Sequence, residues 1–301
     1  MTPRVLAILG PTAAGKTRTA IEVARRVDGE VISLDSMQAY QGMNIGTATP
    51  DALERGGVPH HMFDVWPIAH ALTIVEFRDA ARAAIEDVWS RGRLPIAVGG
   101  SGLYVRAVLE TLEPPGTDPD VRAVLEERLA EEGSRALHAE LQRVDPAAAA
   151  AIAPTNGRRI VRALEVNAIT GTPFNARLPT PEDRYVTTRV GIAIDRVSLD
   201  ARIEERVDEM WRRGFVEEVR QLREEGLADA PTARAALGYG PILAHLSGEI
   251  SEAEARDQTV ADTRRFARRQ QRWFAGDLRT YWVEFNEPSL VEDVSVWATR
   301  T

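Results

Sequence analysis

The chain has 301 residues, 44% of them hydrophobic and 27% charged, a composition typical of globular proteins large enough to bury a full core. Its formal net charge of −8 argues against a protein that coats nucleic acid nonspecifically, although a local basic groove remains compatible with it. Because the chain has no cysteine, disulfides and thiolate metal sites are excluded.

Membrane insertion and secretion are not expected either. The sequence has no apolar run of about 18 residues, the length that commonly marks a membrane span. Its N-terminus enters the apolar segment 5–9 without the cationic region and cleavage site of a secretory signal. Together with the missing cysteines, these features predict a cytoplasmic protein.

The first third of the chain alternates between strand and helix patterns. Residues 5–9 form a short apolar run that ends at a glycine, and residues 16–27 carry apolar side chains at helical spacing. A second strand is expected at 31–34, a long amphipathic helix at 73–91 and a third strand at 95–98. This alternation predicts right-handed crossovers and an open, mostly parallel sheet.

The pattern changes after residue 112. Residues 113–119 are rich in proline and read as a hinge or linker, and from 120 to about 171 every segment favours helix. Strand character returns at 188–194 and again at 281–285. The simplest domain division is an α/β core, residues 1–115 and 187–301, interrupted by an all-helical insertion, residues 116–186.

One segment carries a specific phosphate-binding pattern. Its residues fit G-x-x-x-x-G-K-[ST], the P-loop, between an expected strand and an expected helix: Gly10, Pro11, Thr12, Ala13, Ala14, Gly15, Lys16 and Thr17. Lys16 is the only lysine in a chain with 37 basic residues, which indicates a role that arginine does not fill. We expect the loop amides and Lys16 to bind a diphosphate and the Thr17 hydroxyl to help hold Mg²⁺. The fold class is therefore α/β, a P-loop NTPase-like parallel sheet flanked by helices.

Two further segments follow expected strands at the same sheet edge. Asp35 comes after the second strand and has three interpretations: a Mg²⁺ ligand, a general base, or a helix cap paired with Ser36. The glycines of residues 99–104 allow close backbone approach after the third strand, and Ser101 offers a hydroxyl there.

Arginines cluster in two places. Arg158, Arg159 and Arg162 lie in the insertion, and a second group lies near the C-terminus. Between residues 261 and 276 five arginines, including Arg268 and Arg269, oppose one acid. A solvated helix face is one explanation, and the footprint of a nucleic-acid backbone is the other.

These segments together resemble one family, the bacterial tRNA dimethylallyltransferases. The resemblance runs in order from residue 5 to about residue 285 and rests on segments 10–17, 35–40, 46–50, 60–61, 99–104, 162–166, 238–239 and 264–273. It implies transfer of a dimethylallyl group from dimethylallyl diphosphate to N6 of adenosine 37, in the anticodon stem-loop of tRNA. It also implies Mg²⁺ as cofactor, no consumption of ATP and, we expect, a monomer.

The resemblance also implies residue roles. Residues 10–17 would bind the diphosphate, Asp35 would be the general base, and Ser101 would stand in the place of a usual threonine. Lys16, Asp35 and Ser101 are thus the expected catalytic residues. The implied tRNA contacts, with the two C-terminal arginines added, are Asp35, Ser36, Met37, Gln38, Arg122, Arg158, Arg159, Arg162, Arg268 and Arg269.

The chain departs from the family pattern at three positions. Thr49 replaces a usual lysine, Gln41 a common arginine, and Ala235 a usual arginine or glutamine, for which Arg234 is a candidate substitute. Two rival functions stay open: an adenylate prenyltransferase that acts on free nucleotide, and an ATP-dependent P-loop kinase or switch protein.

Overall fold

The computed structural model describes residues 2–175 and 179–299, and the chain divides into two compact units. One unit consists of Met1–Thr111 with Asp183–Thr301, and the other is Leu112–Glu182. The helical unit thus begins and ends four residues before the predicted boundaries of 116 and 186. Residues 176–178 of the predicted insertion lie outside the described part of the chain.

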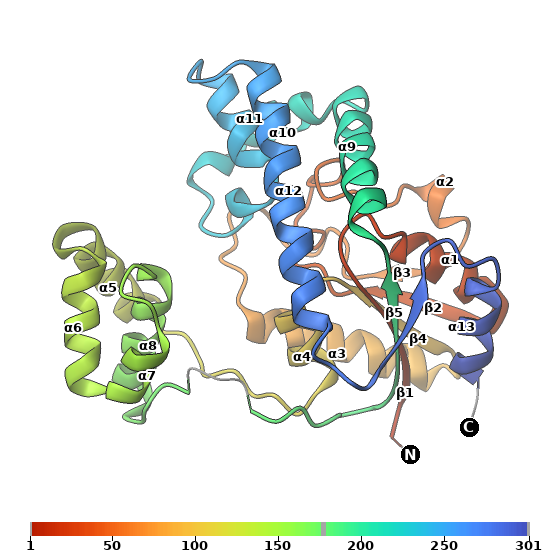
Figure 1. Cartoon of the computed structure of the whole chain (residues 1–301), viewed down its shortest axis with the longest axis horizontal. Coiled ribbons are helices and arrows are strands. Elements are labelled where there is room, and N and C mark those ends of the chain that lie inside the picture. The colour runs from red at the N-terminus through yellow and green to blue at the C-terminus, as the bar shows by residue number, and fades with distance from the viewer. Residues whose placement is uncertain (1, 176–178, 300–301) are drawn as a thin grey trace. The chain divides into compact units, whose positions relative to one another are not determined.

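The larger unit is built on one six-stranded sheet in which every pairing is parallel (Figure 1). Its strand order is β3-β2-β4-β1-β5-β6. The strands are β1 Arg4–Leu9, β2 Gly29–Ser33, β3 His60–His61, β4 Leu94–Gly99, β5 Val186–Ala193 and β6 Thr280–Glu284. The parallel sheet is as predicted, and β3 was not predicted because two residues are too short to show a strand pattern.

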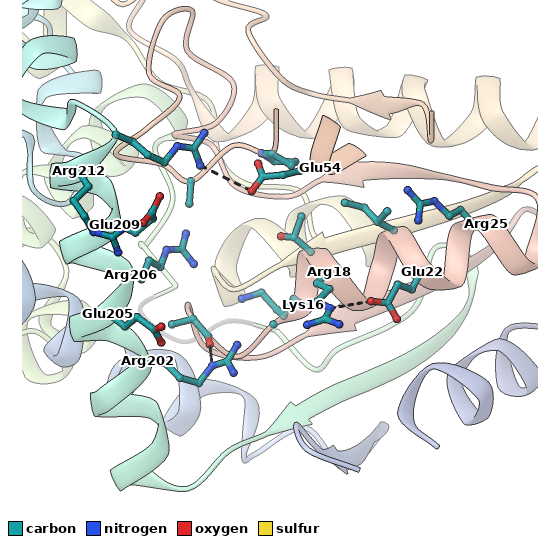
Figure 2. A pocket seen from close by; sticks show the side chains of 17 residues that line it. Lys16, Arg18, Glu22, Arg25, Glu54, Arg202, Glu205, Arg206, Glu209 and Arg212 are labelled. Atoms are coloured by element: carbon teal, nitrogen blue, oxygen red, sulfur yellow. Dashed lines mark hydrogen bonds and ion pairs between the residues drawn. The ribbon is translucent and has the colours of Figure 1, made fainter. Parts of the chain in front are cut away.

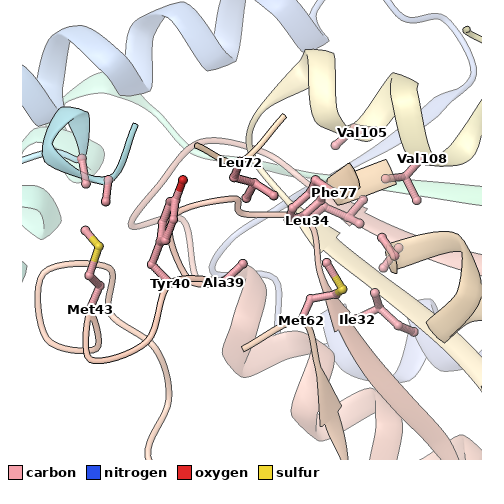
Figure 3. Close-up of a cluster of buried hydrophobic side chains, with 14 of the residues drawn as sticks. Ile32, Leu34, Ala39, Tyr40, Met43, Met62, Leu72, Phe77, Val105 and Val108 are labelled. Carbon is pink, nitrogen blue, oxygen red and sulfur yellow. The ribbon is translucent and has the colours of Figure 1, made fainter. Parts of the chain in front are cut away.

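Helices cover both faces of the sheet, so its strands are apolar on both sides. Along β1, Val5 and Leu9 pack into one core, while Leu6 and Ile8 pack into the other. Figure 3 shows part of the first core, where Ile32 of β2 and Leu34, directly after this strand, meet Phe77 of a long helix, α3. The helices of this unit are α1 Lys16–Val27, α2 Ala52–Arg55, α3 Ile74–Ser90, α4 Gly102–Leu109, α9 Arg196–Arg212, α10 Phe215–Glu224, α11 Tyr239–Leu246, α12 Glu252–Phe274 and α13 Leu290–Thr299, with 3₁₀ turns at Leu227–Asp229 and Ala233–Ala235.

The smaller unit is all-helical over its described residues, as the sequence predicts. It consists of α5 Pro119–Glu132, α6 Ser134–Val144, α7 Pro146–Ala151 and α8 Gly157–Thr170, which enclose a separate apolar core. Arg162 of α8 donates to the main-chain oxygens of Pro115 and Gly116, and the Glu165 carboxylate accepts the Asp118 N–H at 3.1 Å. Residues 115–118 are therefore fixed to this unit, although the sequence assigned them to a hinge.

The order of the strands places three loops side by side at the carboxyl edge of the sheet. β4 lies between β2 and β1, so the loop after β4 is flanked by the loops after β2 and after β1. These three loops contain Ser101, Asp35 and residues 10–17 respectively. Among the described helices, none has the length and apolar character needed to cross a bilayer.

Candidate active site

The predicted phosphate-binding loop leads directly into the N-terminus of a helix. It connects β1 to α1, which begins at Lys16, and Gly15 before it has a φ of +98°, in the left-handed region that favours glycine. The first N–H groups of a helix have no acceptor within the helix, and the helix dipole adds partial positive charge there. The start of α1 is therefore suited to bind a phosphate.

A cavity of about 640 Å³ opens in front of this loop. Its walls come from the first turns of α1, from α9, and from the segment that contains Ala48, Pro50 and Glu54 (Figure 2). Lys16, Thr17 and Arg206 are among its lining residues. The cavity thus joins the predicted phosphate site to basic side chains from a distant part of the chain.

Lys16 is held inside the protein next to a second cation. Its Nζ donates to the main-chain oxygen of Pro11 at 2.7 Å. Burial, followed by the charge of Arg206, lowers the pKa of Lys16 to about 7, and Asp35 partly opposes this shift. A lysine with so low a pKa gains its full charge when an anion enters, which favours a phosphorylated ligand.

Two arginines of α9 were missed by the sequence analysis. Arg202 donates from Nε to the main-chain oxygen of Ala13 at 2.8 Å and so holds the phosphate-binding loop. Arg206 lines the cavity and forms no hydrogen bond or ion pair with any described residue. Burial lowers the pKa of Arg206, yet a guanidinium stays charged in proteins. Their spacing of i, i+4 was a weak signal, because glutamates stand between them.

Asp35 combines solvent access with a raised pKa. Its Oδ1 accepts the Met37 N–H at 3.0 Å, which caps a turn, and its other oxygen has no hydrogen-bond partner among the described residues. The side chain is accessible to solvent, but the protein around it displaces enough water to raise the pKa of Asp35, against the opposing charges of Lys16 and Arg206. The residues directly after Asp35 form a turn and not a helix, so the helix-cap interpretation is wrong. The turn uses one carboxylate oxygen and leaves the other for a base or a metal ligand.

The residues after Asp35 have structural partners. Ser36 is buried, and Gln38 donates to the main-chain oxygens of Thr47 and Ala48 at 3.1 and 3.4 Å. Glu218, which the sequence analysis also missed, accepts the N–H groups of residues 44, 45 and 46. Gln38 and Glu218 together fix the segment that forms one wall of the cavity. Met37 is half-buried against the neighbouring core.

Ser101 lies at the end of β4, between the other two loops. It immediately precedes α4, but its hydroxyl does not cap that helix and has no partner among the described residues. The hydroxyl is therefore available to a ligand. Tyr104, one turn further on, hydrogen-bonds to Ser36, and burial raises the pKa of Tyr104.

In the helical unit, the four arginines predicted to touch nucleic acid divide into two pairs. Arg122 and Arg162 both ion-pair with Glu165, whose side chain is fully buried. Arg158 and Arg159, at the start of α8, are exposed. The first pair stabilises the unit itself, so the exposed pair is better placed for an external partner.

The arginine-rich face of α12 is partly neutralised. Arg264 and Arg268 ion-pair with Glu204 and Asp200 of α9, at 2.8 and 3.2 Å, and Arg265 pairs with Asp262. The remaining arginines of this face, Arg269 and Arg272, are exposed and form no ion pair with a described residue. Of the two arginines predicted to bind tRNA here, only Arg269 is free to do so without first breaking an ion pair.

The three departures from the family pattern have ordinary local contacts. Thr49 is buried and hydrogen-bonds to the hydroxyl of Thr47 at 2.9 Å. Gln41 and Arg234 are exposed and donate to main-chain oxygens. Arg234 contacts the oxygen of Ala228 and is not among the residues that line the cavity.

A metal site made of protein ligands alone is absent among the described residues, where no group of three histidines or carboxylates converges. Mg²⁺ does not require one, because it commonly binds to one or two protein oxygens together with substrate phosphates and water. Thr17 lines the cavity, and its hydroxyl has no partner in the described part of the chain. The residues present therefore fit a Mg²⁺ ion that arrives with a phosphorylated substrate.

The fold and the site define a class: an α/β protein with a P-loop, a basic cavity and a carboxylate with a raised pKa at one sheet edge. Comparison with known proteins identifies the family within this class. The family model described as IPP transferase matches residues 38–277, and that described as Isopentenyl transferase matches residues 3–64. The chain belongs to the IPP transferase family.

Relatives and solved structures agree with this family. The chain is 53% identical, over 96% of its length and 84% of the relative's, to a tRNA dimethylallyltransferase of Salinispora arenicola. The crystal structure of a tRNA isopentenylpyrophosphate transferase from Bacillus halodurans matches with 38% identity and a TM-score of 0.71, over 99% of this chain and 95% of that one. A eukaryotic dimethylallyltransferase acting on tRNA matches with 26% identity and a TM-score of 0.79, over 96% and 75%.

Proposed function

We propose that the protein transfers a dimethylallyl group from dimethylallyl diphosphate to N6 of adenosine 37 in the anticodon stem-loop of tRNA. The observation that carries this proposal is the position of Asp35, a carboxylate with one unpartnered oxygen and a raised pKa, close enough to Lys16 and Arg206 for their charges to act on it. A base beside an anion site suits a reaction in which an amine attacks and a diphosphate leaves.

The diphosphate is the leaving group, and the cavity is built to stabilise its charge. The first N–H groups of α1, Lys16 and Arg206 all present positive charge or hydrogen-bond donors to the same space. Allylic diphosphates ionise readily when the departing charge is stabilised, so these groups lower the barrier to breaking the C–O bond. Mg²⁺, with the Thr17 hydroxyl as its protein ligand, would supply additional positive charge to the diphosphate.

Asp35 acts on the other reactant. An exocyclic adenine amine is a poor nucleophile, and a carboxylate that takes its proton makes the nitrogen more reactive. One N–C bond forms at the amine, one C–O bond breaks at the donor, and the proton goes to Asp35. The unpartnered Ser101 hydroxyl, on the loop between Asp35 and the phosphate-binding loop, can donate to the base or to the diphosphate. No phosphoryl group is transferred, so ATP is not consumed.

A tRNA acceptor fits the exposed arginines that each of the two units carries. Adenine in an anticodon loop must leave its stack to reach an enclosed site, and single-stranded loops are the parts of RNA whose bases can be extruded in this way. Arg269 and Arg272 on α12, and Arg158 and Arg159 on α8, are exposed arginines suited to backbone phosphates. We also propose that the protein works in the cytoplasm, where tRNA is available as its acceptor. The resemblance to the family carries the further expectation of a monomer.

The test compares acceptors under one set of conditions. The protein is incubated with labelled dimethylallyl diphosphate and Mg²⁺, together with unmodified tRNA, with free AMP, or with ATP alone. The proposal predicts label in tRNA only and no ATP turnover. Label in AMP but not in tRNA indicates an adenylate prenyltransferase, and ATP turnover without prenyl transfer indicates a kinase or switch; either result contradicts the proposal.

A further inference from the structure

A buried glutamine of α12 contacts the phosphate-binding loop directly. Gln270 is 7% exposed, and its Oε1 accepts the N–H of Thr12 at 2.8 Å. The two residues are 258 positions apart in the sequence. The N–H of Thr12, which the sequence analysis included in the diphosphate cradle, is therefore already occupied, and Thr12 is not among the residues that line the cavity.

The other end of the same carboxamide lies against the glycine-rich turn after β4. A Cβ atom built on Gly100 would lie 2.4 Å from Nε2 of Gln270 and 3.0 Å from the main-chain oxygen of Gly10. The first distance is too short for any side chain, so only glycine leaves room for the carboxamide at this position. Gln270 thus fills the space between the loop after β1 and the loop after β4.

Two helices hold adjacent residues of the phosphate-binding loop through opposite main-chain groups. Gln270 of α12 accepts the N–H of Thr12, and Arg202 of α9 donates to the oxygen of Ala13 at 2.8 Å. Ala13 has a φ of +62°, a left-handed conformation that is strained for a non-glycine residue and persists only where the surroundings enforce it. The contacts on either side of its N–Cα bond are well placed to enforce it.

We propose that Gln270 is a positioning residue for the anion site. By fixing the N–H of Thr12 it holds the loop in its binding shape before the donor arrives, so that the remaining N–H groups face the diphosphate at no further ordering cost. The direct consequence of this role is tighter binding of a diphosphate. The role of Gln270 therefore rests on the proposed function only for the identity of the prenyl donor.

The chain offers a matched control one residue away. Gln271 has the same side chain on the same helix, and its Nε2 donates to the main-chain oxygen of Ile194, directly after β5. It therefore also ties α12 to the sheet edge, but not to the phosphate-binding loop. A merely structural role for Gln270 predicts that the two alanine variants behave alike.

The experiment measures the Kd of inorganic diphosphate with Mg²⁺ by calorimetry, alongside the melting temperature. We expect Gln270→Ala to raise the Kd about fivefold to tenfold, the scale of one lost hydrogen bond, and Gln271→Ala to leave it unchanged. Gln270→Met, which keeps the side-chain volume and removes the acceptor, should raise the Kd equally and serves if the alanine variant is unstable. An unchanged Kd in Gln270→Met, or an equal rise in Gln271→Ala, would overturn the proposal.

Substitution of Gly100 tests the same proposal independently. Gly100→Ala should displace the carboxamide and weaken diphosphate binding in the wild-type background. In the Gln270→Ala background the same change should raise the Kd of diphosphate much less, because the carboxamide is no longer there. Fully additive effects would contradict the proposal. Because neither arm requires tRNA, wild-type protein that binds diphosphate without prenylating tRNA would refute the proposed function and leave the role of Gln270 decided by these comparisons.

Discussion

Arg202 donates to the main-chain oxygen of Ala13 at 2.8 Å, so the helix that brings Arg206 to the cavity also holds the phosphate-binding loop. Because Arg202 and Arg206 lie on the same helix, this hydrogen bond fixes the position of Arg206 relative to the loop that leads to Lys16. The anion site consequently depends on α9 as much as on the loop motif itself, and α9 supplies the first variant that tests it.

Arg206→Ala should weaken binding of inorganic diphosphate by about tenfold to a hundredfold, as expected for one or two lost hydrogen bonds to a charged group. Arg206 has no other partner among the described residues, so its loss should change stability little. Arg212→Ala is the matched control, because Arg212 lies on the same helix and lines the same cavity but ion-pairs with Glu209. Calorimetry on both variants checks this, and equal losses would remove Arg206 from the anion site.

The affinity for diphosphate should fall as the pH rises above about 7. Burial and Arg206 lower the pKa of Lys16 to about 7, so in the free protein the ammonium loses its proton through that range. Only the charged form attracts the ligand, and binding above pH 7 must therefore include proton uptake, which lowers affinity by up to about tenfold per pH unit. Lys16→Arg stays charged and shows only the titration of the ligand. Identical pH profiles for the two proteins would contradict the assignment, and we expect Lys16→Arg to have lost most transfer activity.

Asp35→Asn should reduce prenyl transfer by at least about a hundredfold, the usual scale for loss of a general base, and should leave tRNA affinity unchanged. Because the surrounding protein displaces water and so raises the pKa of Asp35, the wild-type rate should also fall as the pH drops through this raised value, where the carboxylate becomes protonated. Single-turnover rates over a pH series, with tRNA binding measured in parallel, check both statements. A near-normal rate in the variant would mean that another group takes the proton.

Arg269→Ala should weaken tRNA binding and reduce the slope of log affinity against log salt by about one, the change expected for one lost phosphate contact. Arg269 is exposed and stacks near Phe266 without an acidic partner among the described residues. Arg265→Ala serves as the control, because Arg265 lies one turn earlier on the helix and pairs with Asp262. Binding titrations at several salt concentrations distinguish the two, and an unchanged slope for Arg269→Ala would make this face an ordinary solvated surface.

The sequence predicted the local elements well because their signals are local. The apolar runs and the glycine before Lys16 indicated β1, the phosphate-binding loop and α1, and the long helical stretch after residue 119 indicated the second unit. The position of Asp35 next to the P-loop followed from a general property of parallel sheets, whose carboxyl ends share one edge.

The partners of these residues could not be predicted, since they come from distant parts of the chain. Arg206 and Glu218 lie in segments that look like ordinary amphipathic helices, and Gln270 lies among arginines that drew attention to themselves. Only the folded chain brings these three residues to the loops after β1 and β2. For some arginines, folding removes a role that the sequence predicted. Arg162 and Arg268 looked free in the sequence, but folding gives each an acidic partner.

Prenylation of a single adenosine in tRNA can be measured on two matched transcripts. A tRNA transcript with adenosine at position 37, and the same transcript with guanosine there, are incubated with protein, dimethylallyl diphosphate and Mg²⁺, and their nucleosides are analysed by mass spectrometry. We predict that the first tRNA gains one C₅H₈ unit on adenosine and that the second remains unmodified. No modification of either tRNA, or equal modification of both, would refute the proposed transfer to adenosine 37.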